Sequence, residues 1–368
     1  MSSLTFSAPP VAPASSTAGD AIAVTGNGDL LQRIRHARYL RQGVAYHIVC
    51  KTLQSFMLLA PDPELEVRGL VAGVIGRAQR NWPEVRLFAA AFLSNHFHLL
   101  LEGAPESVVP FIAFIKREIS RRISERIGWS GPMWARYHAS AVITEAAQLR
   151  CFKYIMGQGV KEGLVDTPEQ WPGFHCAQAF TSVTPITGDW FDATAYGKAQ
   201  YKEKAKQSPR PIDKRRYFER YPVTFSRLPV WAGLPDAAYQ SQVKGVIDEV
   251  VAEGRKSRTP SVRPAATAVV ESAIVRKDAP SVLPFLASIA QGHVDLPAWF
   301  TERRRLIAWD SPLAPEVRSY LDDYWSFQRA FRAASALRIA GDEAASFPVG
   351  AFRPGHPKPV AAAQLAAA

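Results

Sequence analysis

Two apolar runs separated by only two polar residues are the feature that most constrains the fold. Residues 85–93 form one dense apolar run, and residues 96–101 form another immediately after Ser94 and Asn95. A run of this kind is typical of a buried central strand. Because the connection is only two residues long, the two strands are expected to pair as an antiparallel hairpin.

The pattern around this hairpin predicts a small α+β domain. The expected elements are a strand over 44–50, a helix over 63–81, the hairpin strands, a helix over 105–127, a strand over 134–143 and a helix over 145–156. Thr144 is the expected N-cap of the last helix, and Glu145 favours its first turn. The order β-α-β-β-α-β-α predicts a ferredoxin-like split βαβ fold, with helices on one face of an antiparallel sheet.

Composition divides the chain of 368 residues into five parts. They are a disordered leader (1–30), a globular domain (33–180), a basic linker or arm (181–235), a mainly helical extension (236–345) and a disordered tail (346–368). Helical patterns return within the extension over 237–253, 282–289 and 315–339. The basic clusters 202–206 and 214–216 have two equally favoured interpretations. One is an arm that contacts phosphates, and the other is a solvated linker.

Charge and cysteine content indicate the partner and the compartment. The net charge is +11, which favours a polyanionic partner, although such a charge also keeps an ordinary protein in solution. The three cysteines have no metal-like spacing and are too few for a disulfide framework, which predicts a cytoplasmic protein. No apolar run is long enough to cross a bilayer, so no membrane partner is expected.

The second hairpin strand carries two histidines in alternate positions. On a strand, His96 and His98 share one face while Phe97 points into the opposite layer. This arrangement predicts a pair of imidazole ligands for one divalent metal. A His-x-His motif also arises by chance, and the alternative is two histidines whose hydrogen bonds are satisfied within a half-buried strand.

The helix that follows the fourth strand supplies the second half of the predicted site. Tyr154 and Gln158 are four residues apart and therefore lie on one helical face. A tyrosine beside a metal is a candidate nucleophile on phosphorus, provided that a cation such as the metal or Lys153 favours its phenolate. Gln158 offers a neutral oxygen that completes the coordination by the two imidazoles. The alternative is a half-buried tyrosine and a glutamine near a helix end.

Basic residues that could contact nucleic acid lie on several elements. The helix over 105–127 has an apolar stripe, and its other face is basic. The predicted DNA contacts are Lys116, Arg117, Arg121, Arg122, Arg136, Lys153 and Lys161. As a solvated charged face, the same residues need no function.

Together these motifs resemble the REP-associated tyrosine transposases, which belong to the single-tyrosine HUH transposase superfamily. The likeness covers residues 35–180 and rests on the Asn-His-Phe-His motif (95–98), Tyr154, Gln158, Gly-Leu-Val (163–165) and Trp-Pro (171–172). The resemblance implies an HUH catalytic domain over 33–180, in which His96, His98 and Gln158 bind Mg²⁺ or Mn²⁺. It also implies that Tyr154 attacks single-stranded DNA and forms a 5′-phosphotyrosine link.

The chain departs from the family pattern at two places. Gln158-Gly159 stands where the family usually has Asn-Pro, and Gly173-Phe174 replaces the Ser-Ser that often follows Trp-Pro. Gln158 keeps an amide ligand and resembles the compact insertion-sequence transposases of the same superfamily. The helix exit differs, and so does the positioning of Tyr154 that depends on it.

The sequence therefore predicts a metal-dependent DNA transesterase that cleaves and rejoins single-stranded DNA at hairpin-flanked sites. It would act as a monomer or homodimer on single-stranded or hairpin DNA, in the cytoplasm and at the nucleoid when bound. Two alternatives stay open. One is a catalytically silent nucleic-acid-binding regulator on the same fold, and the other is a metal-dependent nuclease that uses water as its nucleophile.

Overall fold

The computed structural model describes residues 37–61, 66–182, 184–206, 210–257, 306–307, 309–311 and 314–352. The expected leader over 1–30, the helical pattern over 282–289 and the tail beyond residue 352 lie outside the described residues.

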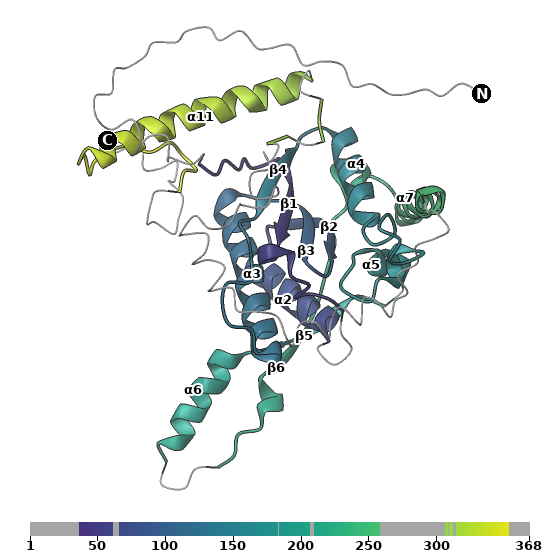
Figure 1. Ribbon diagram of the computed structural model, residues 1–368, viewed down its shortest axis with the longest axis vertical. Coiled ribbons are helices and arrows are strands. Elements are labelled where there is room, and N and C mark those ends of the chain that lie inside the picture. The colour runs from purple at the N-terminus through teal and green to yellow at the C-terminus, as the bar shows by residue number, and fades with distance from the viewer. Residues whose placement is uncertain are drawn as a thin grey trace.

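The centre of the fold is a four-stranded antiparallel sheet in the order β2-β3-β1-β4 (Figure 1). Its strands are β1 (Ala45–Lys51), β2 (Arg86–Phe92), β3 (His96–Glu102) and β4 (His138–Val142). The expected hairpin is confirmed, because Phe92 pairs with Phe97 across it and the Leu93 amide donates to the His96 carbonyl oxygen at 2.8 Å. The class is mixed α and β with an antiparallel sheet, as the sequence predicts.

Helices cover both faces of this sheet. The helices α2 (Val67–Asn81) and α3 (Pro105–Ile127) pack on one face, and α4 (Glu145–Met156), α5 (Ala177–Thr181) and α7 (Asp236–Ser257) belong to a second core on the other. The expectation of helices on a single face is therefore corrected. Strands β2 and β3 bury apolar side chains on both sides, such as Leu99 toward the first core and Leu100 toward the second, so both faces need a cover.

The ends of the helices agree with the capping residues in the sequence. The Thr144 hydroxyl accepts from the Ala147 amide at 3.2 Å, which confirms the predicted N-cap of α4. Helix α3 begins with Pro105 in its first turn and ends at Gly128, whose φ of 66° is the left-handed conformation that favours glycine. The Thr144 cap fixes the start of α4, the helix that carries Tyr154.

The segment expected to be a basic linker or arm contains regular structure. Strands β5 (Thr187–Phe191) and β6 (Phe218–Pro222) form an antiparallel pair that packs on α2, and α6 (Ala193–Lys204) lies between them in the chain. Figure 1 shows α6 projecting away from the sheet, and none of its residues is buried. Short 3₁₀ turns occur at Leu53–Ser55, Pro168–Gln170, Lys214–Tyr217 and Pro229–Trp231.

The C-terminal part of the described chain returns to the sheet. Residues 306–307 lie beside β4, where the Ala141 amide donates to the Leu306 carbonyl oxygen at 2.9 Å. Helix α11 (Pro315–Ile339) then packs its buried Tyr320 near Tyr46 of β1. Residues more than 160 positions apart in the sequence are thus neighbours at the β4 edge.

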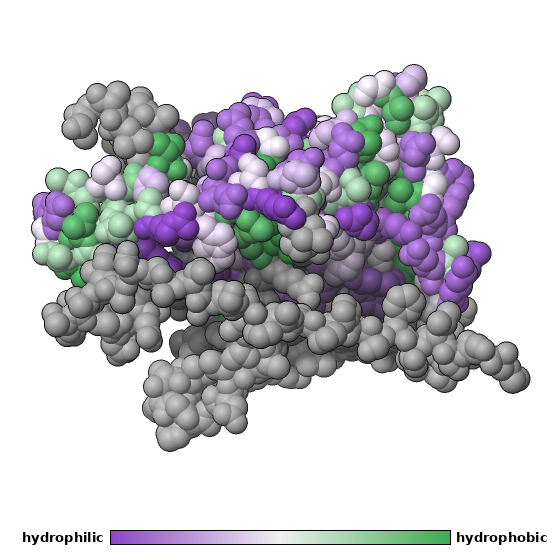
Figure 2. Space-filling model, turned by 90° about the horizontal axis from the view of Figure 1, so that it is seen from above, coloured by the Kyte–Doolittle hydropathy of each residue, from purple (hydrophilic) through white to green (hydrophobic). Residues whose placement is uncertain are grey.

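Within the described ranges, no helix combines the length and apolar character that crossing a membrane requires. The three cysteines, Cys50, Cys151 and Cys176, are all buried and form no disulfide. Figure 2 shows a face on which hydrophilic and hydrophobic residues are interspersed over the described surface.

Close backbone packing between α2 and β5 gives a stability prediction. A Cβ added at Gly73 would collide with the backbone of Asp189, whereas one added at Gly69 in the same helix meets no atom within 4 Å. We expect Gly73→Ala to destabilise the fold by about 1–3 kcal/mol through overpacking. Gly69→Ala should instead stabilise it by about 0.5–1 kcal/mol, because alanine is the better helix former. Urea denaturation of both variants measures the difference, and equal shifts would contradict the packing seen here.

Candidate active site

The two histidines of β3 lie side by side on the face that α4 covers. The ring centroids of His96 and His98 are 4.9 Å apart, with their planes nearly perpendicular at 88°. Phe97 points into the opposite core, where it stacks on Phe92 at 4.9 Å. The strand alternation expected from the sequence therefore brings both imidazoles to one place.

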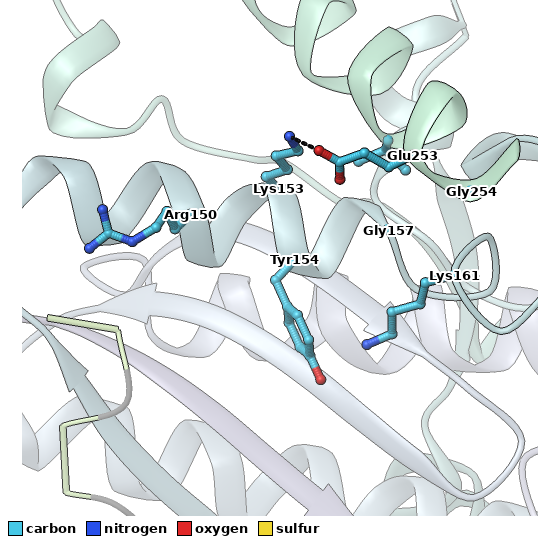
Figure 3. Close-up of a pocket in the computed structure, with 8 residues that line it drawn as sticks. Arg150, Lys153, Tyr154, Gly157, Lys161, Glu253 and Gly254 are labelled. Atoms are coloured by element: carbon cyan, nitrogen blue, oxygen red, sulfur yellow. Dashed lines mark hydrogen bonds and ion pairs between the residues drawn. The ribbon is translucent and has the colours of Figure 1, made fainter. Parts of the chain in front are cut away.

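Helix α4 places Tyr154 directly over these histidines. The Tyr154 ring centroid lies 5.5 Å from that of His98 and 5.9 Å from that of His47 on β1. Figure 3 shows the phenol projecting from α4 toward the strands. A helix side chain and two strand side chains thus meet between the sheet and α4.

Gln158, just beyond the end of α4, is fully buried beside the same group. Its Nε2 donates to the Tyr154 carbonyl oxygen at 3.0 Å, which fixes the orientation of the amide. Its Oε1 has no hydrogen-bond partner among the described residues, and the same is true of His98 Nε2. Buried polar atoms normally find partners, so two orphaned atoms in one site call for an explanation.

The hydrogen bonds of His96 show which of its nitrogens carries a lone pair. Asn95 Nδ2 donates to the Ser55 carbonyl oxygen at 3.2 Å, so Asn95 Oδ1 is the atom that faces His96 Nδ1 at 2.7 Å. His96 therefore donates through Nδ1, and its Nε2 keeps a lone pair. Gln158 lies within hydrogen-bonding reach of His96, and its Oε1 also offers only lone pairs.

Two acceptors that face each other without a proton between them fit a cation. Neutral nitrogen and oxygen donors of this kind are suitable ligands for a divalent metal. Within the described part of the chain, no group of three or more His, Cys, Asp or Glu side chains suits a metal ion. The candidate ligand set is therefore two histidines and an amide, in which His98 Nε2 and Gln158 Oε1 are the two unpartnered atoms.

Burial keeps these histidines uncharged. It lowers the pKa of His96 to about 4; Lys51 and Lys161 lower it further, and the neighbouring Gln158 side chain acts in the opposite direction. Burial also holds the pKa of His98 well below its usual range, reinforced by His47 and His96. Both imidazoles are consequently neutral at pH 7, the state in which histidine binds metals.

The cation next to Tyr154 is Lys161. Its ammonium nitrogen lies 3.7 Å from the centre of the Tyr154 ring, and Figure 3 shows it directed toward the phenol. Lys153 instead points toward α7, where it pairs with Glu249 at 2.8 Å and Glu253 at 2.7 Å. Tyr154, Lys153 and Lys161, together with Arg150, line a cavity of about 360 Å³ between α4 and α7.

The predicted DNA contacts on α3 belong to a helix that packs on the opposite face of the sheet from this site. Glu118 pairs with Arg117 at 3.1 Å and Arg121 at 3.0 Å. Arg122 packs 4.1 Å over the Trp190 ring and donates to the Phe191 carbonyl oxygen. Burial lowers the pKa of Arg122 to about 10.

Lys116 and Arg136 are two more of the predicted DNA contacts. Lys116 donates to the Ala135 carbonyl oxygen at 3.1 Å, and Arg136 is exposed beside Tyr137. The structure therefore brings His96, His98, Tyr154, Gln158 and Lys161 together, and keeps the α3 residues apart from them.

His47 and Trp309 belong to the site and were not expected from the sequence. His47 Nε2 lies 3.0 Å from His98 Nδ1, and the Trp309 indole nitrogen donates to His47 Nδ1 at 3.1 Å. The Trp309 ring also lies 5.0 Å from that of Tyr154. Strand alternation alone gives no pairing register, so only the structure shows that His47 meets His98.

Comparison with known proteins gives distant similarities. No protein-family model and no curated protein sequence matches the chain. The chain is similar to the structure of a REP-associated tyrosine transposase bound to a REP hairpin, with 20% identity, a TM-score of 0.32 and coverage of 41% of this chain and 88% of that one. It is also similar to a candidate transposase from Deinococcus radiodurans R1, with 21% identity, a TM-score of 0.24 and coverage of 34% and 98%.

His175, next to the site, gives a prediction about acid stability. It is fully buried, and burial lowers its pKa to about 4 from 6.5. Below pH 6.5 the His175 imidazole is protonated in the unfolded chain but stays neutral in the folded chain. The free energy of unfolding therefore falls as the pH drops toward 4. We expect this group to remove about 3 kcal/mol between pH 7 and pH 4. Urea denaturation at the two pH values tests this, and His175→Gln should make the loss smaller. An unchanged loss in that variant would contradict the assignment.

Proposed function

We propose that the protein is a metal-dependent transesterase that cleaves and rejoins single-stranded DNA through a 5′-phosphotyrosine intermediate. In this proposal the strand order β2-β3-β1-β4, with α2 and α3 as crossovers, is a ferredoxin-like HUH domain. The observation that carries the proposal is the convergence of unpartnered buried ligand atoms with a tyrosine and a lysine at one point. An unpartnered buried atom alone does not mark a site, as Gln148 shows, but here two such atoms lie beside the tyrosine and the lysine.

His96, His98 and Gln158 would hold a Mg²⁺ or Mn²⁺ ion. Bound there, the ion would polarise a non-bridging oxygen of the scissile phosphate. The buried strand β3 fixes both histidines, and the Gln158 bond to the Tyr154 carbonyl oxygen fixes the amide. The backbone and rotamers of these side chains are thus held in place before any substrate arrives.

Tyr154 is the proposed nucleophile. Its hydroxyl oxygen bonds to phosphorus and releases its proton, while the bond from phosphorus to the 3′ oxygen breaks and the leaving strand takes up a proton as a 3′-hydroxyl. Lys161, 3.7 Å from the ring centre, stabilises the negative charge that develops near the phenol. The phosphotyrosine conserves one phosphodiester, so a second 3′-hydroxyl can reverse the step without a nucleotide cofactor.

The cavity between α4 and α7 offers the DNA backbone its first contacts. Arg150 and Lys161 both line this cavity and are exposed to solvent. Two cations at the entrance favour a phosphate-bearing strand. The α3 residues lie on the other side of the sheet, so they would contact only DNA that wraps around the domain.

A covalent-adduct assay tests the proposal. The full chain is incubated with Mn²⁺ and a pool of hairpin oligonucleotides that carry a 3′ label and randomised single-stranded flanks. Because Tyr154 would retain the 5′ phosphate of the downstream fragment, the label should migrate with the protein on a denaturing gel. The band should disappear when EDTA removes the metal.

The same assay separates the alternatives. A nuclease that uses water would shorten the labelled DNA and leave no adduct. A silent regulator would retard the hairpins on a native gel, with or without EDTA, and cleave none of them. Either result would refute the transesterase.

A further inference from the structure

A chain of three side chains connects the C-terminal segment to the site. The Trp309 indole donates to His47 Nδ1 at 3.1 Å, and His47 Nε2 lies 3.0 Å from His98 Nδ1. The rings of His47 and His98 are stacked, with centroids 5.1 Å apart and planes 14° from parallel. His98 Nε2, at the end of this chain, is buried without a partner among the described residues.

The indole determines the direction of these hydrogen bonds, because it can donate but never accept. His47 Nδ1 must therefore be an acceptor. A charged imidazole carries a proton on both nitrogens, so the acceptor Nδ1 makes His47 neutral, with a single proton. The His47 proton then lies on Nε2, which donates to His98 Nδ1. The His98 proton is consequently left on Nε2.

A protonated Nε2 has no lone pair for a metal. For His98 Nε2 to become a ligand, His98 must carry its proton on Nδ1 instead. That Nδ1–H then donates to His47 Nε2, which must be an acceptor. The His47 proton consequently moves to Nδ1 of His47. That proton would face the indole N–H of Trp309 at 3.1 Å, donor against donor. Contact with Trp309 and coordination by His98 are therefore incompatible.

Trp309 is held in place by the residues around it. The neighbouring Asp310 accepts from the backbone amides of Ile143 and Thr144 at 2.8 and 2.9 Å. Arg150 donates to the Trp309 carbonyl oxygen at 2.6 Å. The indole contact is therefore part of an anchored segment and not of an isolated exposed side chain.

We propose that His47 is a positioning residue that relays the state of Trp309 to His98, so that the metal has two protein ligands while the indole is engaged and three once it withdraws. This inference rests on the metal site of the proposed function. Trp309 would then set how tightly the site binds its ion, through a proton position and without touching the ion.

The test uses the full chain, Mn²⁺ alone and the variant Trp309→Phe, which keeps an aromatic ring and removes the donor. Long-range ¹H–¹⁵N spectra of the metal-free, ¹⁵N-histidine-labelled protein read the tautomer of each ring, with His98 assigned through a His98→Gln variant. We expect the proton on Nε2 of His98 in the wild type and on Nδ1 in Trp309→Phe. Calorimetry should show Mn²⁺ binding tightened about 10-fold, the size of effect that second-shell partners have.

Two controls isolate the relay. Trp325→Phe, on α11, removes a half-exposed indole and should leave the tautomers and the Mn²⁺ affinity unchanged. In a His47→Phe background, Trp309→Phe should have no further effect on affinity, because the relay is already broken.

Three results would overturn the inference. They are a wild-type His98 with its proton on Nδ1, equal Mn²⁺ affinity in wild type and Trp309→Phe, or an undiminished Trp309 effect without His47. Equal, measurable affinities leave the proposed metal site intact, whereas the absence of Mn²⁺ binding in every variant refutes that site and the relay together.

Discussion

Replacing Tyr154 with phenylalanine will abolish the covalent DNA adduct. The phenol oxygen is the proposed attacking atom, and phenylalanine keeps the ring that packs on His98 at 5.5 Å and under Lys161. We expect the rate of adduct formation to fall by about 10⁴-fold or more, as when another enzyme loses its nucleophile. The measurement is the time course of labelled protein on a denaturing gel with Mn²⁺ present.

A second tyrosine provides the matched control. Tyr201 on α6 is 79% exposed and lies outside the site, so Tyr201→Phe should form adduct at the wild-type rate. Mn²⁺ affinity measured by calorimetry should be unchanged in Tyr154→Phe, because no ligand atom is lost. Cleavage that persists in Tyr154→Phe would show that another nucleophile, such as water, attacks the phosphate.

Replacing Gln158 with leucine will have opposite effects on metal binding and on stability. The variant removes the unpartnered Oε1, so Mn²⁺ affinity should fall by about 100-fold or more, since even second-shell changes cost 10–100-fold. The orphaned Gln158 carbonyl costs the metal-free protein about 1–3 kcal/mol, the Tyr154 carbonyl left without this donor costs the variant a similar amount, and burial of the leucine side chain adds stability. The metal-free variant should therefore unfold at the same urea concentration as the wild type or at a higher one.

Gln148 is the natural comparison for this experiment. It is also buried, lies on α4, and its Oε1 also has no partner among the described residues. It is not among the residues that meet Tyr154 and the histidines, so Gln148→Leu should leave Mn²⁺ binding unchanged. Equal losses in the two variants would mean that Gln158 supports the fold and does not bind the ion.

The elements of the domain are predictable because their signals are local. The two-residue connection at Ser94 and Asn95 predicts the β2-β3 hairpin, and Thr144 predicts the start of α4. The face that α4 covers is not predictable in this way. It depends on strands that are apolar on both sides, a pattern that does not say which helix packs where.

The residues of the candidate site also divide into those that local geometry predicts and those that it does not. His96 and His98 come together through strand alternation, and Tyr154 and Gln158 through helical spacing, so short-range geometry predicts both pairs. His47 contacts His98 although it lies 51 residues earlier in the sequence. Trp309 contacts His47 although it lies 262 residues later. Contacts across such separations depend on register and on docking of the C-terminal segment, for which a single sequence carries no periodic signal.

The bond between the Gln158 side chain and the Tyr154 carbonyl oxygen has a mechanical consequence. It ties the Gln158 amide to the backbone of the residue that carries the phenol, so the amide and the Tyr154 backbone move together. Any sliding of α4 over the sheet alters their separations from the β3 imidazoles in concert. The Gln158 amide therefore keeps its distance from the Tyr154 backbone while the distances of both from the histidines change.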